Sequence, residues 1–163
     1  GQTVLGKKIK LSSIESDIHF HNGFTWWDAR LASAYGTIEV RPCSQQPANA
    51  TMVVAAFSLG LIENLSEAKK LYDSYSLSEW RKLRFDVLRN GLRATITTSP
   101  VSPLVKQALG IARKGLKKRG LGEEVFLDPL DKRLKAKQTI ADEVKHLFDK
   151  NDLSKFFDLV EIR

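Results

Sequence analysis

The period of the hydrophobic pattern changes near residue 47, and this change limits the fold more than any other feature. Polar and apolar residues alternate from Thr37 to Arg41, and Pro42 then ends the run. Such a period of two is typical of a β-strand. From Ala48 onward the apolar residues recur every three to four positions, which is the period of a helix. The chain is therefore expected to have an α+β fold, with antiparallel strands in its N-terminal third packed with four to five helices.

Two further segments of the N-terminal third have strand character. Residues Lys7–Leu11 alternate weakly and are expected to form an edge strand. Residues Phe24–Arg30 are rich in strand-forming side chains, and Tyr35-Gly36 separates them from the strand at Thr37. The short connection favours an antiparallel pair.

Helix signals fill the rest of the chain. The first helix is expected to carry an apolar stripe of Met52, Val53, Ala56, Phe57, Gly60 and Leu61. The second is expected to begin at an N-cap Ser78, with Trp80, Leu83, Val87 and Leu88 facing inward. The third has Ser102 as its predicted cap, Val105, Ala108, Leu109, Ala112 and Leu116 inward, and Gly120 at its end. The fourth is capped by Thr139, with Ile140, Val144, Leu147 and Phe148 inward, and a short amphipathic helix is expected over 153–160. With neither a repeat nor a linker, residues 1–163 are predicted to form a single domain.

Composition narrows the class of protein. A hydrophobic content of 42% with 28% charged residues is typical of a globular chain. No apolar run approaches the ~20 residues that a membrane-spanning helix needs, so no membrane partner is expected. The single cysteine, Cys43, excludes an internal disulfide and suits a reducing compartment, so a cytoplasmic location is expected.

The net charge of +7 attracts polyanions, so a basic nucleic-acid-binding module is one alternative. Most lysines and arginines stand at helical spacing between apolar residues, as on solvated helix faces. Neither zinc-ligand spacing nor interleaved aromatic and basic residues accompanies them. A nucleic-acid partner is therefore not favoured, and steep salt-dependent binding of DNA or RNA is the observation that would favour it.

The strand at Thr37–Arg41 places a carboxylate and a guanidinium on one face. Side chains alternate along a strand, so Glu39 and Arg41 point one way, about 7 Å apart, while Ile38 and Val40 are available for burial on the other face. A carboxylate can hold Mg²⁺, and a guanidinium can grip phosphoryl oxygens. An ordinary salt-bridged strand facing solvent explains the same spacing, so the pattern alone leaves both alternatives open.

The order of several short motifs resembles a known family. Trp26-Trp27-Asp28-Ala29-Arg30, Gly36–Pro42 and Gln45-Gln46-Pro47 are similar to the C-terminal active-site segment of the glutamate–cysteine ligases and bacterial carboxylate–amine ligases. The helix from Trp80 to Leu92, with Arg89 ahead of Gly91-Leu92, and the run Lys118-Arg119-Gly120 extend this resemblance over residues 24–148. The resemblance implies the C-terminal half of a glutamine synthetase-like catalytic domain.

A more distant similarity, to glutamine synthetase, implies roles for the strand residues. There the Glu of a Glu-x-Arg strand is a divalent-metal ligand and the Arg contacts the transferring phosphoryl group. Carried onto this chain, Glu39 would bind Mg²⁺ or Mn²⁺ and Arg41 would stabilise phosphoryl transfer from ATP. The implied reaction joins glutamate to an amine such as cysteine through a γ-glutamyl phosphate.

Four further residues take weaker roles, each with a plainer alternative. Arg30 is a candidate to grip a substrate carboxylate, or else pairs with Asp28. Candidate substrate- or nucleotide-binding residues are Arg89, Trp27 and Asn49. Their respective alternatives are a solvated helix charge, a core side chain and a residue that stabilises a turn.

The sequence also departs from the family. It holds neither a Glu-x-Glu strand nor a Gly-rich phosphate loop, so it supplies only part of a ligase site. The first residue is Gly1 and the sole methionine is Met52, so a fragment or one chain of a split enzyme is expected, inactive alone.

Its expected partners are the N-terminal half of the same enzyme and, through an exposed sheet edge, further copies of itself. A non-catalytic interaction domain derived from a ligase half is the other alternative, and the acceptor amine cannot be read from this half.

Overall fold

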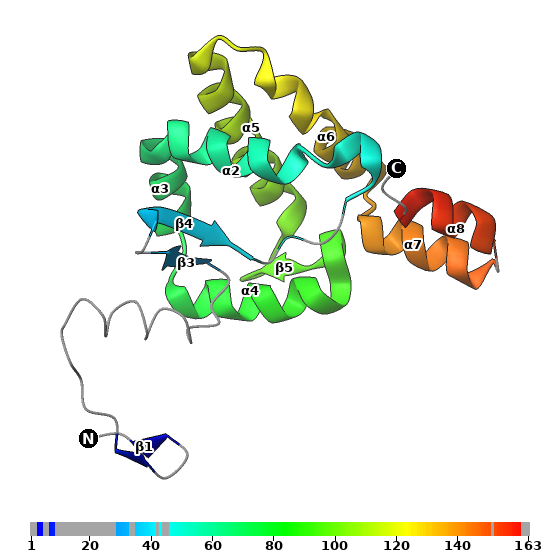
Figure 1. Ribbon diagram of the computed structural model, residues 1–163, viewed down its shortest axis with the longest axis horizontal. Coiled ribbons are helices and arrows are strands. Elements are labelled where there is room, and N and C mark those ends of the chain that lie inside the picture. Colours follow the sequence, from blue (N-terminus) through cyan, green and yellow to red (C-terminus); the bar gives the residue numbers. More distant parts are fainter. Residues whose placement is uncertain are drawn as a thin grey trace. The chain divides into compact units, whose positions relative to one another are not determined.

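The computed structural model describes residues 3–4, 7–8, 29–32, 35–41, 43, 46–150 and 152–160. The chain divides into two compact units, Gly1–Ser44 and Gln45–Arg163, and each is described here by itself (Figure 1). Trp27, Asp28 and Pro42 lie outside the described residues. The single domain predicted from the sequence stays a prediction.

The described part of the first unit consists of two antiparallel ladders. Strands β1 (Thr3–Val4) and β2 (Lys7–Lys8) form one, and β3 (Ala29–Ala32) and β4 (Thr37–Val40) form the other. In the second ladder Ala32 pairs with Thr37, and the connection passes through Gly36 at a φ of +62°. That left-handed conformation suits glycine, which explains why Tyr35-Gly36 interrupts the strand pattern.

The second unit is mostly helical. Its elements are η2 (Ala48–Ala50), α2 (Val53–Glu63), α3 (Leu65–Asp73), α4 (Leu77–Asn90), η3 (Gly91–Arg93), β5 (Thr95–Ile96), β6 (Ser99–Pro100), α5 (Val101–Arg119), η4 (Glu123–Leu127), α6 (Asp128–Ala136), α7 (Ile140–Asp149) and α8 (Leu153–Val160). The described residues thus contain seven α-helices and three two-stranded antiparallel sheets. The predicted α+β class is confirmed, although four to five helices were expected.

The core of the second unit forms where α2 and α5 cross. A Cβ added to Gly60 would lie 2.3 Å from the backbone oxygen of Ala112, and one added to Gly115 would lie 2.0 Å from that of Gly60. Only glycine permits backbones to approach so closely, so these two residues set the distance between the helices. Leu116 and Leu127, both fully buried, pack beside this crossing.

A buried amide fixes the same pair of helices. Asn64, 4% exposed, donates from Nδ2 to the carbonyl of Ile111 at 3.2 Å and accepts from Lys118 Nζ at 2.8 Å. Because a buried polar group without partners is costly, these bonds favour one register of α2 against α5.

The helix caps agree only in part with the sequence. Thr139 caps α7 through a capping box with Asp142, as predicted, and Gly120 ends α5 at a φ of +70°. The N-cap of α4 is Ser76 rather than Ser78, because Ser76 forms a reciprocal capping box with Glu79. Ser102 does not cap α5, which begins at Val101; its hydroxyl instead donates to the carbonyl of Leu92 at 3.3 Å.

Three side chains expected to face inward are exposed: Met52 by 51%, Leu88 by 75% and Phe148 by 64%. Each lies at the margin of its predicted stripe, where a small rotation of the helix brings the side chain to solvent. Phe148 instead contacts Phe156 of α8 edge-to-face, with ring centroids 6.5 Å apart. Helices α3 and α6 were not expected from the sequence at all.

No single helix in the described residues is both long and apolar enough to cross a membrane. Residues 48–63 and 65–73 pass that test only as a pair, bent by 91°.

Candidate functional site

Three charged side chains meet on one face of the β3–β4 ladder. Arg30 and Glu39 stand directly opposite each other in the register, and Arg41 follows Glu39 by two positions on the same face. Arg30 donates from Nε to Glu39 Oε2 at 2.7 Å, and Arg41 donates from Nε to Glu39 Oε1 at 2.8 Å. We call Arg30, Glu39 and Arg41 the strand cluster. The structure thus brings together three residues that the sequence singled out.

The strand cluster holds two cations around one anion. The hydrogen bond from Arg41 and then that from Arg30 lower the pKa of Glu39 below its ordinary value of 4.5. Glu39 is therefore ionised at neutral pH and orients both guanidinium planes. A guanidinium has five N–H donors in a fixed fork, a geometry that suits carboxylate and phosphoryl oxygens.

The opposite face of this ladder carries apolar side chains. Ile38 and Val40, which the sequence left available for burial, are 61% and 45% exposed. The arginine side chains are less exposed, at 20% for Arg30 and 23% for Arg41.

The other predicted site residues are not part of the strand cluster as described. Trp27 lies outside the described residues. Arg89 is exposed in the last turn of α4, and Asn49 is exposed in η2, both in the second unit. Asn49 also lines a pocket that the sequence did not predict.

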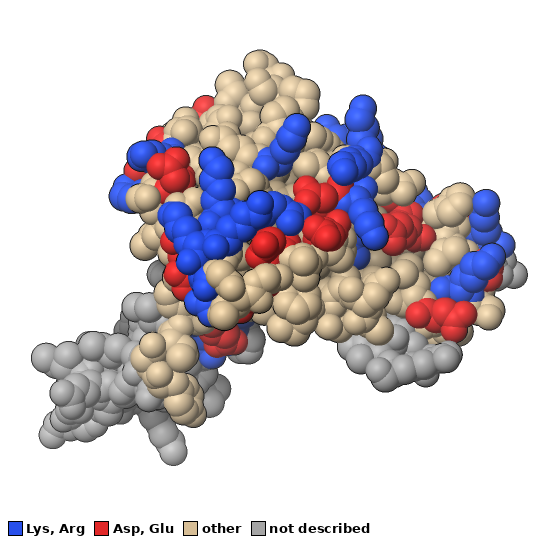
Figure 2. Space-filling model, turned by 90° about the horizontal axis from the view of Figure 1, so that it is seen from above, with Lys and Arg blue, Asp and Glu red and all other residues tan. Residues whose placement is uncertain are grey.

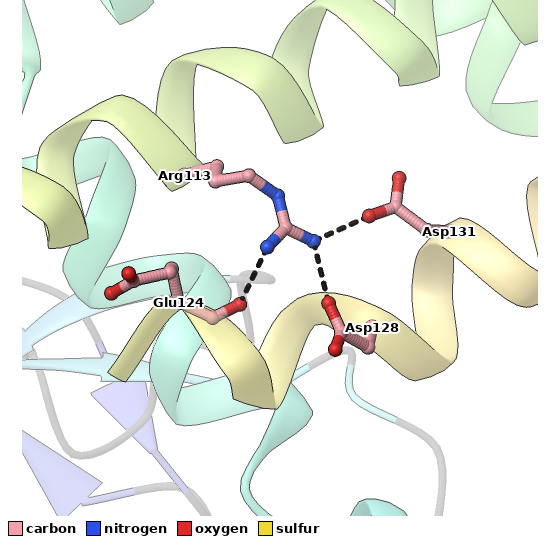
Figure 3. A network of polar contacts seen from close by, with 4 residues as sticks. All are labelled: Arg113, Glu124, Asp128 and Asp131. Carbon is pink, nitrogen blue, oxygen red and sulfur yellow. Dashed lines mark hydrogen bonds and ion pairs between the residues drawn. The ribbon is translucent and has the colours of Figure 1, made fainter. Parts of the chain in front are cut away.

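A second arginine network lies in the helical unit, and the sequence analysis missed it. Arg113 of α5 donates to the carbonyl of Glu124 at 2.9 Å, to Asp128 at 3.0 Å and to Asp131 (Figure 3). Burial on its own lowers the pKa of Arg113, but the hydrogen bonds to Asp128 and Asp131 outweigh burial and raise it. Arg113 and these three partners, the helix cluster, fasten η4 and α6 to α5.

Several other basic residues of α5 have partners in the same unit. Lys118 donates to Asn64, and Arg119 pairs with Glu63 at 2.7 Å and Glu123 at 2.6 Å. Figure 2 shows acidic side chains lying among the basic ones on the face that it presents. The positive net charge is thus interrupted on this face, as on a solvated surface.

Comparison with known families identifies the kind of protein to which this ladder belongs. The sequence profile of glutamate-cysteine ligase family 2 matches residues 6–154, a range that includes the strand cluster and nearly all of the helical unit. The chain therefore belongs to glutamate-cysteine ligase family 2 and forms a glutamate-cysteine ligase-like domain. A search of curated proteins finds no significant match.

The described residues by themselves do not fit a resident divalent cation. Glu39 is the carboxylate of the strand cluster, and both of its oxygens already accept hydrogen bonds from arginine. Within the described ranges there is no group of three or more His, Cys, Asp or Glu side chains that could hold a metal ion. A hard cation prefers several oxygen ligands, whereas two guanidiniums around one carboxylate suit an anion.

Proposed function

We propose that this chain supplies the phosphoryl-binding part of an ATP-dependent carboxylate–amine ligase of the glutamate–cysteine ligase type. The observation that carries the proposal is the strand cluster, in which one carboxylate orients two arginines through their Nε atoms. Membership of the family supports the reaction class.

In the proposed reaction, a carboxylate oxygen of glutamate attacks the γ-phosphorus of ATP, and the β–γ bridging oxygen leaves with ADP. The nitrogen of an amine such as cysteine then attacks the acyl carbon of the γ-glutamyl phosphate. Inorganic phosphate leaves, and the amine nitrogen loses a proton. Negative charge on the transferred phosphoryl group is stabilised best by fixed cations, and the protein has little covalent work to do.

Arg41 and Arg30 take the catalytic roles in this proposal. Arg41 contacts the transferring phosphoryl group, and Arg30 grips either that group or a substrate carboxylate. Glu39 holds both guanidiniums in place through their Nε atoms. Fixing a cation before the reaction lowers the reorganisation that the transition state requires.

The role of Glu39 as a ligand of Mg²⁺ or Mn²⁺ stays a prediction. For Glu39 to serve as a ligand, at least one of its oxygens must exchange an arginine for the cation, and the other ligands must come from outside the described residues. The substrate- or nucleotide-binding roles of Arg89, Trp27 and Asn49 stay predictions in the same sense, as does a cytoplasmic location.

We further propose that this chain is inactive alone and acts with the N-terminal half of the same enzyme. Ile38 and Val40 form an exposed apolar face on the β3–β4 ladder, which suits burial against further structure or against another copy of the chain.

The test uses the full-length gene product that contains this chain. Glutamate-dependent ADP release with Mg²⁺ is measured for the parent protein and for Glu39→Ala, Arg41→Ala and Arg81→Ala. Arg81 is an exposed residue of α4 outside both clusters and serves as the matched control. We expect Arg41→Ala to lose roughly 10²–10³-fold in kcat, as for other fixed donors to transition-state charge. Absence of ADP release in the parent protein, or full activity of both strand-cluster variants, would show the assignment to be wrong.

A further inference from the structure

Arg133 of α6 forms a hydrogen bond that joins residues 87 positions apart in the sequence. It donates from Nη1 to Gln46 Oε1 at 2.7 Å. Its Nε lies 4.0 Å from Glu143 Oε1, beyond hydrogen-bonding distance, so the bond to Gln46 is the closer of these two contacts. The side chain of Arg133 is 14% exposed, less than the 25% of Arg113. A hydrogen bond shielded from water in this way is stronger than one at the surface.

The segment that begins at Gln46 is fixed to the helical unit. Pro47 precedes η2, and its carbonyl accepts from the backbone N–H of Ala50 at 2.8 Å. Ala50 is 4% exposed. Arg133 thus holds the segment at Gln46, and burial of Ala50 holds it at the other end. The chain therefore has a fixed position from Gln46 onward.

Gln46 follows the strand cluster closely in the sequence. Four residues separate it from Arg41, which the proposed function places at the transferring phosphoryl group. A connection of this length spans at most about 18 Å even when it is fully extended. Fixing Gln46 therefore restricts the positions open to the end of β4, so a hydrogen bond that holds Gln46 acts on Arg41 through the chain.

Helix α6 has other contacts that keep it in place. The helix cluster already fastens it to α5 through Asp128 and Asp131. Loss of the bond between Arg133 and Gln46 should therefore release the connection to the strand rather than the helix. In this respect Arg133 differs from Arg113, whose partners all lie in η4 and α6 (Figure 3).

We propose that Arg133 is a positioning residue for the ligase reaction, which holds Gln46 and thereby keeps Arg41 at the transferring phosphoryl group. The inference rests on the proposed function, because Arg133 itself contacts no reacting atom. Small displacements of a fixed donor are costly, since a shift of about 1 Å can lower a rate by roughly 10²-fold.

The test is a double-mutant cycle in the full-length gene product. Arg133→Met and Gln46→Met each remove the hydrogen bond and keep a side chain of similar length. We expect kcat for glutamate-dependent ADP release to fall roughly 10–10²-fold in each variant, with KM for ATP within about threefold of the parent. The double variant should lose no more than the larger single loss, because both changes break the same contact.

Arg113→Met is the matched control, since it makes the same change at another partly buried arginine of the helical unit. It should lower stability and leave kcat of the folded protein unchanged. Circular dichroism under the assay conditions checks that each variant is folded. Arg133→Lys keeps the charge and one donor, so it should recover part of the lost kcat, and it replaces Arg133→Met if that variant does not fold.

Amide hydrogen exchange gives a readout that needs no activity. Exchange over residues 37–41 should be about fivefold faster in Arg133→Met and Gln46→Met than in the parent, the effect of one lost hydrogen bond on a local opening. It should be unchanged in Arg113→Met.

Three results would overturn the positioning role: parental kcat in folded Arg133→Met, additive losses in the double variant, or unchanged exchange over residues 37–41. Absence of ADP release in the parent, or full activity of both strand-cluster variants, would instead overturn the ligase assignment, and the positioning role in catalysis would fall with it. Hydrogen exchange then still decides whether Arg133 anchors the end of β4, so the two failures are distinguishable.

Discussion

The strand cluster and the helix cluster are built from the same two chemical groups in opposite proportions. In the strand cluster two arginines share one carboxylate, at 2.7 Å and 2.8 Å. In the helix cluster one arginine is shared by two carboxylates and a backbone carbonyl (Figure 3). In the first arrangement one carboxylate orients two guanidiniums on a strand ladder, whereas in the second one guanidinium joins α5 to η4 and α6. The arrangement of partners, rather than the presence of arginine, distinguishes the cluster that we propose binds an anion from the one that fastens helices together.

The largest effect is expected when the charges of the strand cluster are inverted. Arg30→Glu converts two cations around one anion into one cation between two anions. It also places two carboxylates directly opposite each other across the ladder, which is unfavourable. We expect glutamate-dependent ADP release by the full-length gene product to fall by roughly 10³-fold.

The matched control for this inversion is Arg81→Glu, which makes the same charge change on the exposed side of α4. Activity within threefold of the parent for Arg30→Glu would mean that the strand cluster is an ordinary surface ion pair.

Removal of Arg113 should affect stability and leave the chemistry intact. Arg113→Ala leaves a carbonyl and two carboxylates without their shared donor, and we expect the free energy of unfolding to drop by about 1–3 kcal/mol. Denaturant titration followed by circular dichroism measures the loss. Arg113→Lys should recover only part of it, because an ammonium group lacks the planar fork. A fall in kcat of Arg113→Ala under conditions where this variant is fully folded would contradict a structural role for Arg113.

The pKa of Glu39 tests whether its contacts with Arg41 and Arg30 form in solution. Its pKa is lowered by Arg41 and then Arg30, so its ion pairs are fully present above the ordinary value of 4.5 and are lost as the pH falls through the lowered pKa. Carboxyl ¹³C NMR should find Glu39 titrating below 4.5 in the parent and closer to 4.5 in Arg41→Ala. An unchanged pKa in that variant would show that the Arg41 contact is not formed in solution.

The smallest effect is expected for a solvent-exposed pair. Lys69 and Asp73 form an i,i+4 ion pair on α3, with side chains 69% and 52% exposed. Exposed pairs contribute little because water screens them and the side chains lose freedom. Lys69→Ala should therefore leave the denaturation midpoint within experimental error. A loss comparable to that of Arg113→Ala would mean that exposure does not decide the contribution of these pairs.

Local signals were read correctly where neighbours in sequence determine the structure. Alternation gave the strand at Thr37–Val40, the Thr139 cap starts α7, and Gly120 ends α5. The same reasoning put the cap of α4 at Ser78, because two serines stand two positions apart and only the capping box with Glu79 selects Ser76. Helix α3 was missed because few of its residues are apolar, and of these only Leu71 is buried.

For the site, the sequence indicated Glu39, Arg41 and Arg30 from strand alternation and a family resemblance. It expected Arg30 to grip a substrate carboxylate or to pair with Asp28, and both stay predictions; the cross-strand register adds Glu39 as a partner of Arg30, which the sequence did not indicate. The partners of Arg113 could not be read from the sequence, since they lie in η4 and α6.

The sequence by itself determined the α+β class, the family and the face of the strand that carries the charged residues. These depend on local periodicity and on the order of short motifs, which the chain displays without folding. The tertiary structure alone decided which carboxylates Arg30 and Arg113 meet, because those contacts join residues 9 to 18 positions apart. The contact between Arg41 and Glu39 is local, since the two residues are two positions apart on one strand face. Which partners surround an arginine depends on which elements pair and how they pack. The strand cluster and the helix cluster therefore become distinguishable only in the folded chain.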